Sequence, residues 1–211
     1  MMLLLGLVTL QNPPASPPTV VQRSWRGSQK DSYKVAIDFQ DAGGSSSIAF
    51  TLHLRAPKNL PKEGSVDVEA TFVDQVLTFG KLKKETKGPF GSANLKFAPT
   101  GFPSGLLGKG QVGPLMAPLL AWHLPEAVDS EGKYTISEYT TEDGVKVRGT
   151  GKAERERQGE WRVANDLAFS EQNATVGALT TIAWFDAKSG RLLRADGSFK
   201  AKDGSAEFKV R

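Results

Sequence analysis

Residues 159 to 169 read GEWRVANDLAF, and this stretch decides the fold. Its large apolar side chains occupy alternate positions, Trp161, Val163, Leu167 and Phe169, whereas charged, polar or small residues lie between them. Alternation with a period of two is typical of a β-strand that buries one face and exposes the other. We therefore predict a strand here, and the segments around it repeat the pattern.

Turn signals divide residues 132 to 211 into runs of strand length. Glycine adopts a positive φ without steric cost, so Asp-Gly pairs suit the two-residue turns of β-hairpins. The predicted turns lie at Asp143-Gly144, Gln158-Gly159, Asp186 to Gly190 and Asp203-Gly204. The sequence therefore predicts six antiparallel strands that form a meander. The strand at 174 to 185 carries apolar residues at both parities, so we expect both of its faces to be covered.

The N-terminal part of the domain shows the same alternation. Residues 32 to 40 and 48 to 55 each have the pattern of a half-buried strand, and a further short strand is predicted at 94 to 97. In residues 64 to 79 the apolar positions change from even to odd near Val73 and Asp74. Since a slip of one residue turns every following side chain to the other face, this change predicts a bulge or bend, and hence a curved sheet.

Residues 101 to 126 differ from the rest because glycine and proline are frequent in them. Within this insert the apolar side chains of residues 114 to 124 fall on one side of a helix, and Pro118 restricts that helix to a short piece. Large apolar patches are rare on the surface of soluble monomers, so something has to cover the sheet. The predicted fold class is mainly β: a curved antiparallel sheet, as a meander, half-barrel or barrel-like, with a short apolar helical insert.

The N-terminal segment has a different composition. Residues 1 to 10 are almost wholly apolar, and residues 11 to 18 are rich in proline. The apolar run is shorter than the roughly 20 residues that span a bilayer, but its length suits the core of a secretory signal. We therefore expect a signal-like segment and a proline-rich linker in residues 1 to 20, a single antiparallel β domain in 21 to 211, and a periplasmic or secreted location.

The charged and metal-binding residues exclude several function classes. The net charge is +4, with 27 Lys plus Arg against 23 Asp plus Glu scattered along 211 residues. Nucleic-acid binding requires a concentrated basic patch, and we interpret the nearest approach to one, Lys81 to Lys84, as a solvated turn or the guard of an edge strand. Cysteine is absent and the two histidines are His53 and His123, which excludes disulfides, iron–sulfur clusters and three-histidine zinc sites. We predict no cofactor, no metal site and no nucleic-acid partner.

Catalytic motifs are absent: the chain contains no nucleophile elbow, P-loop, dinucleotide fingerprint or zinc-protease helix motif. His123 and Glu126 have the spacing of two metal ligands on one helical face, but Pro125 lies between them and would break the helix. A hydrolase would need carboxylates such as Glu138 and Glu154 to converge in one cleft. We therefore predict that the protein is not an enzyme.

The best candidate for function is the apolar insert together with the sheet beneath it. Large apolar residues in a glycine-rich segment over a curved sheet either form a cleft that admits an acyl chain or fill the core. Asn165 shares the face of the apolar residues of its strand, and since a buried amide needs partners, it either bonds locally or anchors a ligand. The candidate ligand-binding residues are Phe102, Leu106, Leu107, Leu115, Met116, Leu119, Trp122, Asn165 and Trp184.

Residues 184 to 192 read WFDAKSGRL, which resembles a hairpin that recurs in uncharacterised exported β-rich envelope proteins of bacteria. The order of strands, apolar insert and further strands also resembles, in outline, the half-barrel of lipoprotein-carrier-like periplasmic proteins. The last third of the chain shows the resemblance in motif, and the rest shows it only in the order of its elements. This resemblance implies a noncatalytic envelope protein with a hydrophobic groove, although the lipidation cysteine of the lipoprotein relatives is missing.

Three hypotheses about function follow. The first is a noncatalytic extracytoplasmic protein, not transmembrane, that binds a hydrophobic small molecule or lipid in a cleft between the curved sheet and the insert. An envelope protein is the other candidate partner. The second hypothesis is a cell-surface structural or interaction module without an internal pocket. The third is a carboxylate-dependent hydrolase.

Overall fold

The computed structural model describes residue 20 and residues 22–98, 103–104, 117–140, 145–156, 159–172 and 174–211. The predicted signal-like segment and its linker therefore lie outside the described residues, except Val20, as does the turn predicted at Asp143-Gly144. The described part of the chain contains no helix with the length and hydropathy that crossing a membrane requires.

The described residues form eleven strands and one short 3₁₀-helix, η1. Their bounds are β1 (Lys30–Asp41), β2 (Gly44–Arg55), β3 (Val66–Phe79), β4 (Leu82–Phe97), β5 (Pro103–Ser104), η1 (Ala117–Trp122), β6 (Lys133–Thr140), β7 (Lys146–Arg155), β8 (Glu160–Glu171), β9 (Ala174–Asp186), β10 (Leu192–Ala201) and β11 (Gly204–Val210).

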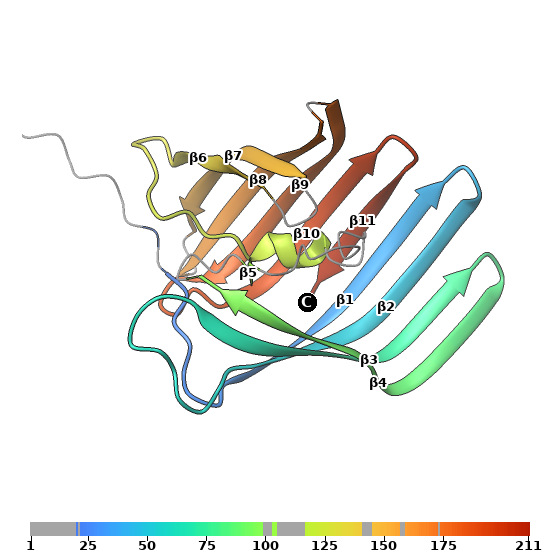
Figure 1. Ribbon diagram of the computed structural model, residues 1–211, viewed down its shortest axis with the longest axis horizontal. Helices are drawn as coiled ribbons and strands as arrows, with labels where there is room; N and C mark the ends of the chain where they lie inside the picture. Colours follow the sequence, from blue (N-terminus) through green and yellow to red (C-terminus); the bar gives the residue numbers. More distant parts are fainter. Residues whose placement is uncertain are drawn as a thin grey trace, which may run out of the picture.

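All eleven described strands belong to one sheet, in the order β5-β4-β3-β2-β1-β11-β10-β9-β8-β7-β6. The last six strands, β6 to β11, are neighbours both in sequence and in space, which confirms the predicted meander (Figure 1). β1 pairs antiparallel with β11, so that Val35 lies opposite Val210 and Asp41 lies opposite Gly204. The first and last strands therefore meet in the middle of the sheet, and β5 and β6 lie at its two edges.

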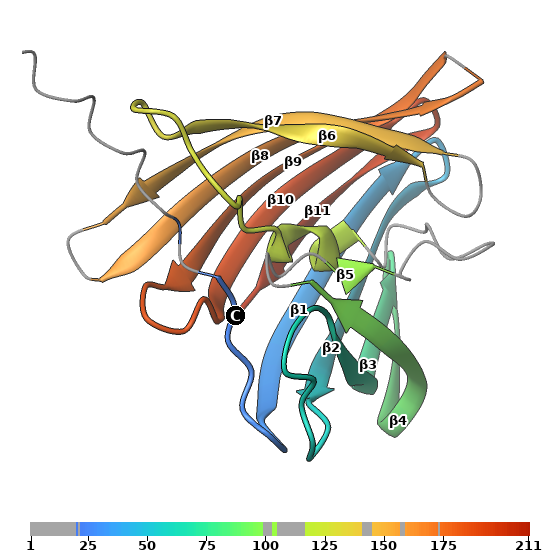
Figure 2. The same cartoon turned by 60° about the vertical axis from the view of Figure 1, so that its left-hand side comes forward.

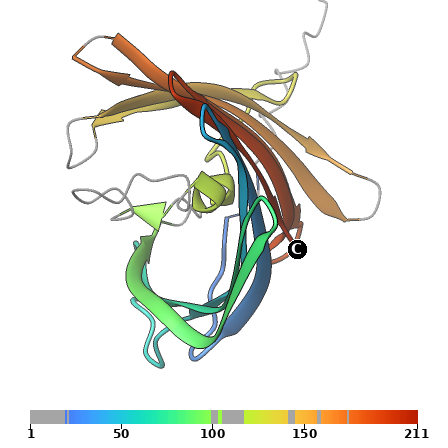
Figure 3. The ribbon, with the colours of Figure 1, turned by 90° about the vertical axis from the view of Figure 1, so that its right-hand side faces the viewer.

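The connection between the two edge strands has to cross the sheet. β5 ends at Ser104 at one edge, and β6 begins at Lys133 at the other. The described part of this connection includes η1, which lies on the concave face against β9, β10 and β11. Figures 2 and 3 show the sheet curving around η1 without closing into a barrel. The predicted curved antiparallel sheet with an apolar insert is therefore confirmed.

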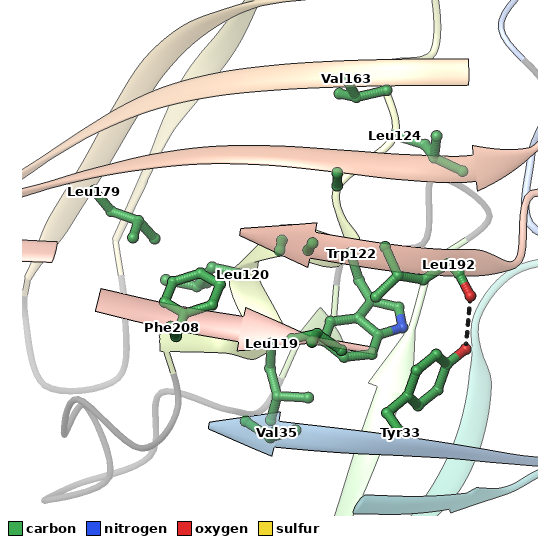
Figure 4. Close-up of a cluster of buried hydrophobic side chains, with 14 of the residues drawn as sticks. Tyr33, Val35, Leu119, Leu120, Trp122, Leu124, Val163, Leu179, Leu192 and Phe208 are labelled. Atoms are coloured by element: carbon green, nitrogen blue, oxygen red, sulfur yellow. Dashed lines mark hydrogen bonds between the residues drawn. The ribbon is translucent and has the colours of Figure 1, made fainter. Parts of the chain in front are cut away.

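The core lies between η1 and the concave face of the sheet. The side chains of Leu119 and Trp122 are fully buried there. The ring of Trp122 meets the ring of Tyr33 edge-on, with centroids 5.2 Å apart, and the Tyr33 hydroxyl donates to the carbonyl of Leu192 at 3.2 Å (Figure 4). Because burying a large apolar side chain contributes about 1.5–3 kcal/mol, these contacts hold η1 on the sheet.

The predicted bulge in the third strand is present. The register between β3 and β4 shifts on both sides of Val73, and Asp74 adopts a φ of 55°, which is uncommon for a residue other than glycine. The carboxylate of Asp74 accepts a hydrogen bond from the backbone N–H of Gly88 at 3.0 Å. This contact joins the two strands at the bulge, where β3 and β4 bend with the rest of the sheet.

The structure corrects the predicted helix. The described residues of the insert form a 3₁₀-helix of six residues from Ala117 to Trp122, in place of an α-helix within 114 to 124. Pro118 lies in its first turn and Pro125 follows its end, so only a short piece of chain is available between the two prolines. A 3₁₀-helix needs bonds between residues three apart and therefore suits so short a segment.

The structure also corrects the strand predicted at 94 to 97. β4 begins at Leu82 and pairs with β3 over almost its whole length. Residues 82 to 93 lack alternation and contain two glycines and a proline, which disfavour strands. Pairing with β3 therefore overrides the weak local preference of these residues.

We predict that Gly197→Ala lowers the free energy of unfolding by about 1–3 kcal/mol, because it overpacks the core. Gly197 lies opposite Phe208 in the sheet, and a Cβ atom at Gly197 would lie 2.2 Å from Cζ of Phe208. Gly91→Ala is the control, since its nearest neighbour, Cδ2 of Phe72, would lie 3.7 Å away. Urea denaturation of both variants checks the prediction, and equal losses of stability would contradict it.

Candidate functional site

Of the nine predicted ligand-binding residues, two lie on η1 against the concave face of the sheet. Leu119 and Trp122 point from η1 into the core and are 1% and 0% exposed. They contact the sheet directly, so a ligand reaches them only if η1 moves. The other predicted residues of the insert, Phe102, Leu106, Leu107, Leu115 and Met116, lie outside the described residues.

Asn165 lies on the concave face and is 1% exposed. Its side-chain oxygen accepts a hydrogen bond from the hydroxyl of Tyr134 on β6, and its Nδ2 donates to Oγ1 of Thr181 on β9 at 3.3 Å. The ring of Tyr134 passes over Gly151 of β7, where a Cβ atom would lie 2.4 Å from the ring. Burial raises the pKa of Tyr134, which keeps the hydroxyl protonated as the donor. Asn165 thus ties three strands together rather than bonding locally.

Trp184 lies on the opposite face of the sheet from η1. Along β9 the buried side chains are Leu179, Thr181, Ala183 and Phe185, whereas Trp184 is only half-buried. The guanidinium of Arg194 covers the Trp184 ring at 4.4 Å from its centroid, and Arg194 also pairs with Glu160 at 3.0 Å. The expectation that both faces of this strand are covered is wrong for the outer face, where Val176 is 38% exposed.

Three phenylalanines form a further apolar surface, which we call the phenylalanine strip: Phe50 of β2, Phe72 of β3 and Phe90 of β4. Their ring centroids lie 5.6 to 6.2 Å from one another. Phe50 has the same orientation as Leu52, which pairs with Tyr33, so the strip lies on the concave face. Phe50 is buried, Phe72 is half-buried and Phe90 is 37% exposed. Water therefore reaches part of an aromatic cluster inside the curve of the sheet.

No pattern in the sequence singles out the phenylalanine strip. Alternation placed Phe50 and Phe72 on apolar strand faces, but it gave no reason to prefer them over the other buried residues. Phe90 stands between Pro89 and Gly91, where no periodic pattern indicates its direction. The strip becomes visible only once the register of β2, β3 and β4 brings the three rings together.

A buried ion pair lies at the opposite end of the concave core from the hairpin that joins β3 to β4. Arg23 donates to Asp31 at 2.7 Å, and the two side chains are 1% and 3% exposed. The guanidinium of Arg23 stacks over Trp25, 3.9 Å from the ring centroid, and Gln29 donates to the same carboxylate oxygen at 3.0 Å. No sequence pattern indicates this pair, because residues 22 to 29 have no periodicity.

Two hollows on the sheet are lined by polar residues. One, of about 450 Å³, lies among the ends of β1, β2, β3 and β11 and includes Asp38, Ser47 and Glu207. The other, of about 690 Å³, lies on β6, β7 and β8 and includes Lys133 and Asp166. Charged and hydroxyl side chains are frequent in both linings, and neither hollow includes a residue of the phenylalanine strip.

The carboxylates considered for hydrolysis are held in ion pairs at the surface. Glu138 pairs with Lys146 at 3.2 Å, and Glu154 pairs with Lys152 and, at 3.6 Å, with Arg162. The hydrogen bond from Lys152 lowers the pKa of Glu154. A general acid needs a raised pKa, which is the opposite direction. Among the described residues, no group of three or more His, Asp and Glu side chains is arranged to hold a metal ion.

Comparison with known proteins identifies no family. No family model matches the chain, and no curated protein matches it. Among solved structures it is similar to a domain classed as an outer membrane lipoprotein-sorting protein from Vibrio parahaemolyticus, with a TM-score of 0.28 and 10% identity over 88% of this chain and 86% of that chain. It is also similar to a DUF1329 family protein from Desulfovibrio piger ATCC 29098, with a TM-score of 0.25 and 9% identity over 87% of this chain and 84% of that chain. TM-scores this low carry no functional information.

The burial of His123 makes folding stability depend on pH. Burial lowers its pKa to about 4, below its ordinary value of 6.5, and its ring lies 5.8 Å from that of Tyr134. As the pH falls, the unfolded chain therefore takes up this proton before the folded chain does. We expect folding stability to fall between about pH 6.5 and pH 4 by about 3 kcal/mol from this residue, since one pKa unit corresponds to about 1.4 kcal/mol.

Urea denaturation across this pH range checks the prediction with His123→Gln. The variant should lose less stability than the parent protein between pH 6.5 and pH 4. His53→Gln is the matched control, because the exposed His53 ring bonds Ser32 at 2.7 Å outside the core. A variant at His123 with the same pH dependence as the parent would show that this residue does not account for the loss.

Proposed function

We propose that the protein is a noncatalytic binding protein that holds a hydrophobic small molecule or a lipid acyl chain on the concave face of its sheet. The observation that carries this proposal is the phenylalanine strip. Ligand sites are concave, mostly apolar and partly open to solvent. A cluster of Phe50, Phe72 and Phe90, of which Phe90 is 37% exposed, has this character.

The position of the strip supports a ligand beside η1 rather than beneath it. Phe50 lies two residues nearer to the β1–β2 hairpin than Leu52, and Leu52 is the partner of Tyr33. Tyr33 in turn contacts Trp122, whose side chain is fully buried. The contacts of η1 are chiefly with β9, β10 and β11, whereas the strip lies on β2, β3 and β4, so the proposed site lies beside η1.

Two of the predicted ligand-binding residues have other roles in this proposal. Asn165 uses its oxygen for Tyr134 and one amide hydrogen for Thr181, so it stabilises the sheet. Trp184 lies on the outer face and does not share a site with the strip. A contribution from the five insert residues outside the described ranges stays a prediction, and so does the extracytoplasmic location, which rests on the sequence of residues 1 to 20 alone.

A fluorescence titration with the apolar probe N-phenyl-1-naphthylamine tests the proposal. We expect saturable binding, and we expect Phe90→Ser to weaken it about tenfold, because the loss of an apolar contact of this size costs about 1.5 kcal/mol. In displacement of the probe by a fatty acid, the parent protein should likewise bind more tightly than the Phe90→Ser variant.

Val176→Ser is the matched control for Phe90→Ser. Val176 is 38% exposed, close to the 37% of Phe90, but it lies on the outer face of the sheet. The control variant should bind the probe like the parent protein. Absence of saturable binding, or an equal loss in both variants, would contradict the proposal and favour an interaction module without a pocket.

A further inference from the structure

The hairpin between β3 and β4 ends in an exposed apolar tip. Phe79 and Leu82 lie directly opposite each other, and the two residues between them, Gly80 and Lys81, make the turn. Gly80 has a φ of 57°, as the first position of a tight hairpin turn requires. The two apolar side chains therefore stand on one face of the sheet, immediately beside the turn.

The exposure of this tip is unusual for the described part of the chain. Phe79 is 57% exposed and Leu82 is 76% exposed, the largest values among its large hydrophobic residues. Single exposed apolar residues are common on soluble proteins. A paired Phe and Leu at the end of a projecting hairpin place their apolar surface together, where water has to solvate it.

Positive charge surrounds the two apolar residues. Residues 79 to 87 contain four lysines, Lys81, Lys83, Lys84 and Lys87, and a single acidic residue, Glu85. Lys83 pairs with Glu85 at 2.7 Å, and the side chains of both are about half exposed. The lysines alone are explained by the guard that an edge strand needs against pairing with another chain. That explanation does not account for the exposed Phe79 and Leu82.

We propose that this tip docks on the surface of an anionic lipid bilayer. In that arrangement Phe79 and Leu82 enter the interfacial region, and the neighbouring lysines contact the lipid phosphates. Apolar side chains flanked by lysine have both properties that interfacial binding uses, burial of apolar area and attraction to anionic headgroups. A second copy of the chain fits this surface poorly, because two tips that each carry a net positive charge repel each other.

The orientation of the tip connects it with the concave face. Leu77 lies opposite the buried Ile48, and Phe79 has the same parity as Leu77, so Phe79 faces the concave side. Figure 1 shows this hairpin ending at the same rim as the β1–β2 and β10–β11 hairpins. Docking would therefore turn the hairpin end of the concave face toward the bilayer. Membrane docking does not require a ligand on the phenylalanine strip, so the two proposals fail separately.

Co-sedimentation with large vesicles tests the docking proposal. We expect the protein to bind vesicles that contain 30% phosphatidylglycerol in phosphatidylcholine at least tenfold more strongly than vesicles of phosphatidylcholine alone. Raising the salt concentration from about 50 to about 500 mM should weaken binding, because the charges become screened. The double variant Phe79→Ser/Leu82→Ser should lower the partition coefficient at least tenfold.

Three variants separate the tip from general surface effects. Val176→Ser removes an exposed apolar residue from the outer face and should leave partitioning unchanged. Leu82→Trp keeps an apolar side chain at the tip and should retain binding. Lys81→Gln/Lys84→Gln should reduce binding to the anionic vesicles.

Two results would overturn the docking proposal. One is unchanged partitioning of the Phe79→Ser/Leu82→Ser variant. The other is a dimer in analytical ultracentrifugation that the same variant abolishes, which would assign the tip to a second copy.

Discussion

The pairing of β1 with β11 is the constraint from which the rest of the architecture follows. It joins strands from the two ends of the domain, with Val35 opposite Val210, and so places β1 to β5 and β6 to β11 in one sheet. β5 and β6 are then at opposite edges, and the chain between them has to cross the sheet. Because the sheet is curved and its concave side is apolar, η1, in the described part of this connection, lies on that side, where Trp122 and Leu119 exclude water.

Local sequence patterns predict individual strands and the bulge, but they do not predict which distant strands pair. Alternation in residues 159 to 169 predicts β8 correctly, and the change of parity near Asp74 predicts the bulge, because both depend on which face a side chain occupies. β4 carries no such pattern: its extended form results from pairing with β3 along residues 82 to 97. The register of β1 against β11 is not encoded in any local pattern, since many strands offer similar apolar faces.

The same difference between local pattern and long-range packing explains which site residues the sequence indicates. Asn165 attracts attention because a polar residue on an apolar face needs partners, and the structure supplies them from the neighbouring strand β9 and, across β7, from β6. Trp184 lies on the outer face although it was a candidate ligand-binding residue, since β9 is apolar at both parities and the sequence does not show which parity faces inward. Phe90 and the Arg23–Asp31 pair depend on non-local packing around residues without periodicity, so no sequence signal selects them.

The two ends of the concave core differ in chemistry, and this difference bears on access to it. One end contains the buried Arg23–Asp31 pair under Trp25, and removing two charges from water there opposes folding unless the geometry is good. Toward the other end Phe90 is 37% exposed, although burying phenylalanine would stabilise the fold. Stability alone would favour a buried Phe90 and a solvent-exposed Arg23–Asp31 pair. The end that contains Arg23 and Asp31 is therefore held by a specific polar contact. An apolar molecule would approach the phenylalanine strip from the hairpin end, where Phe79 and Leu82 are exposed to solvent.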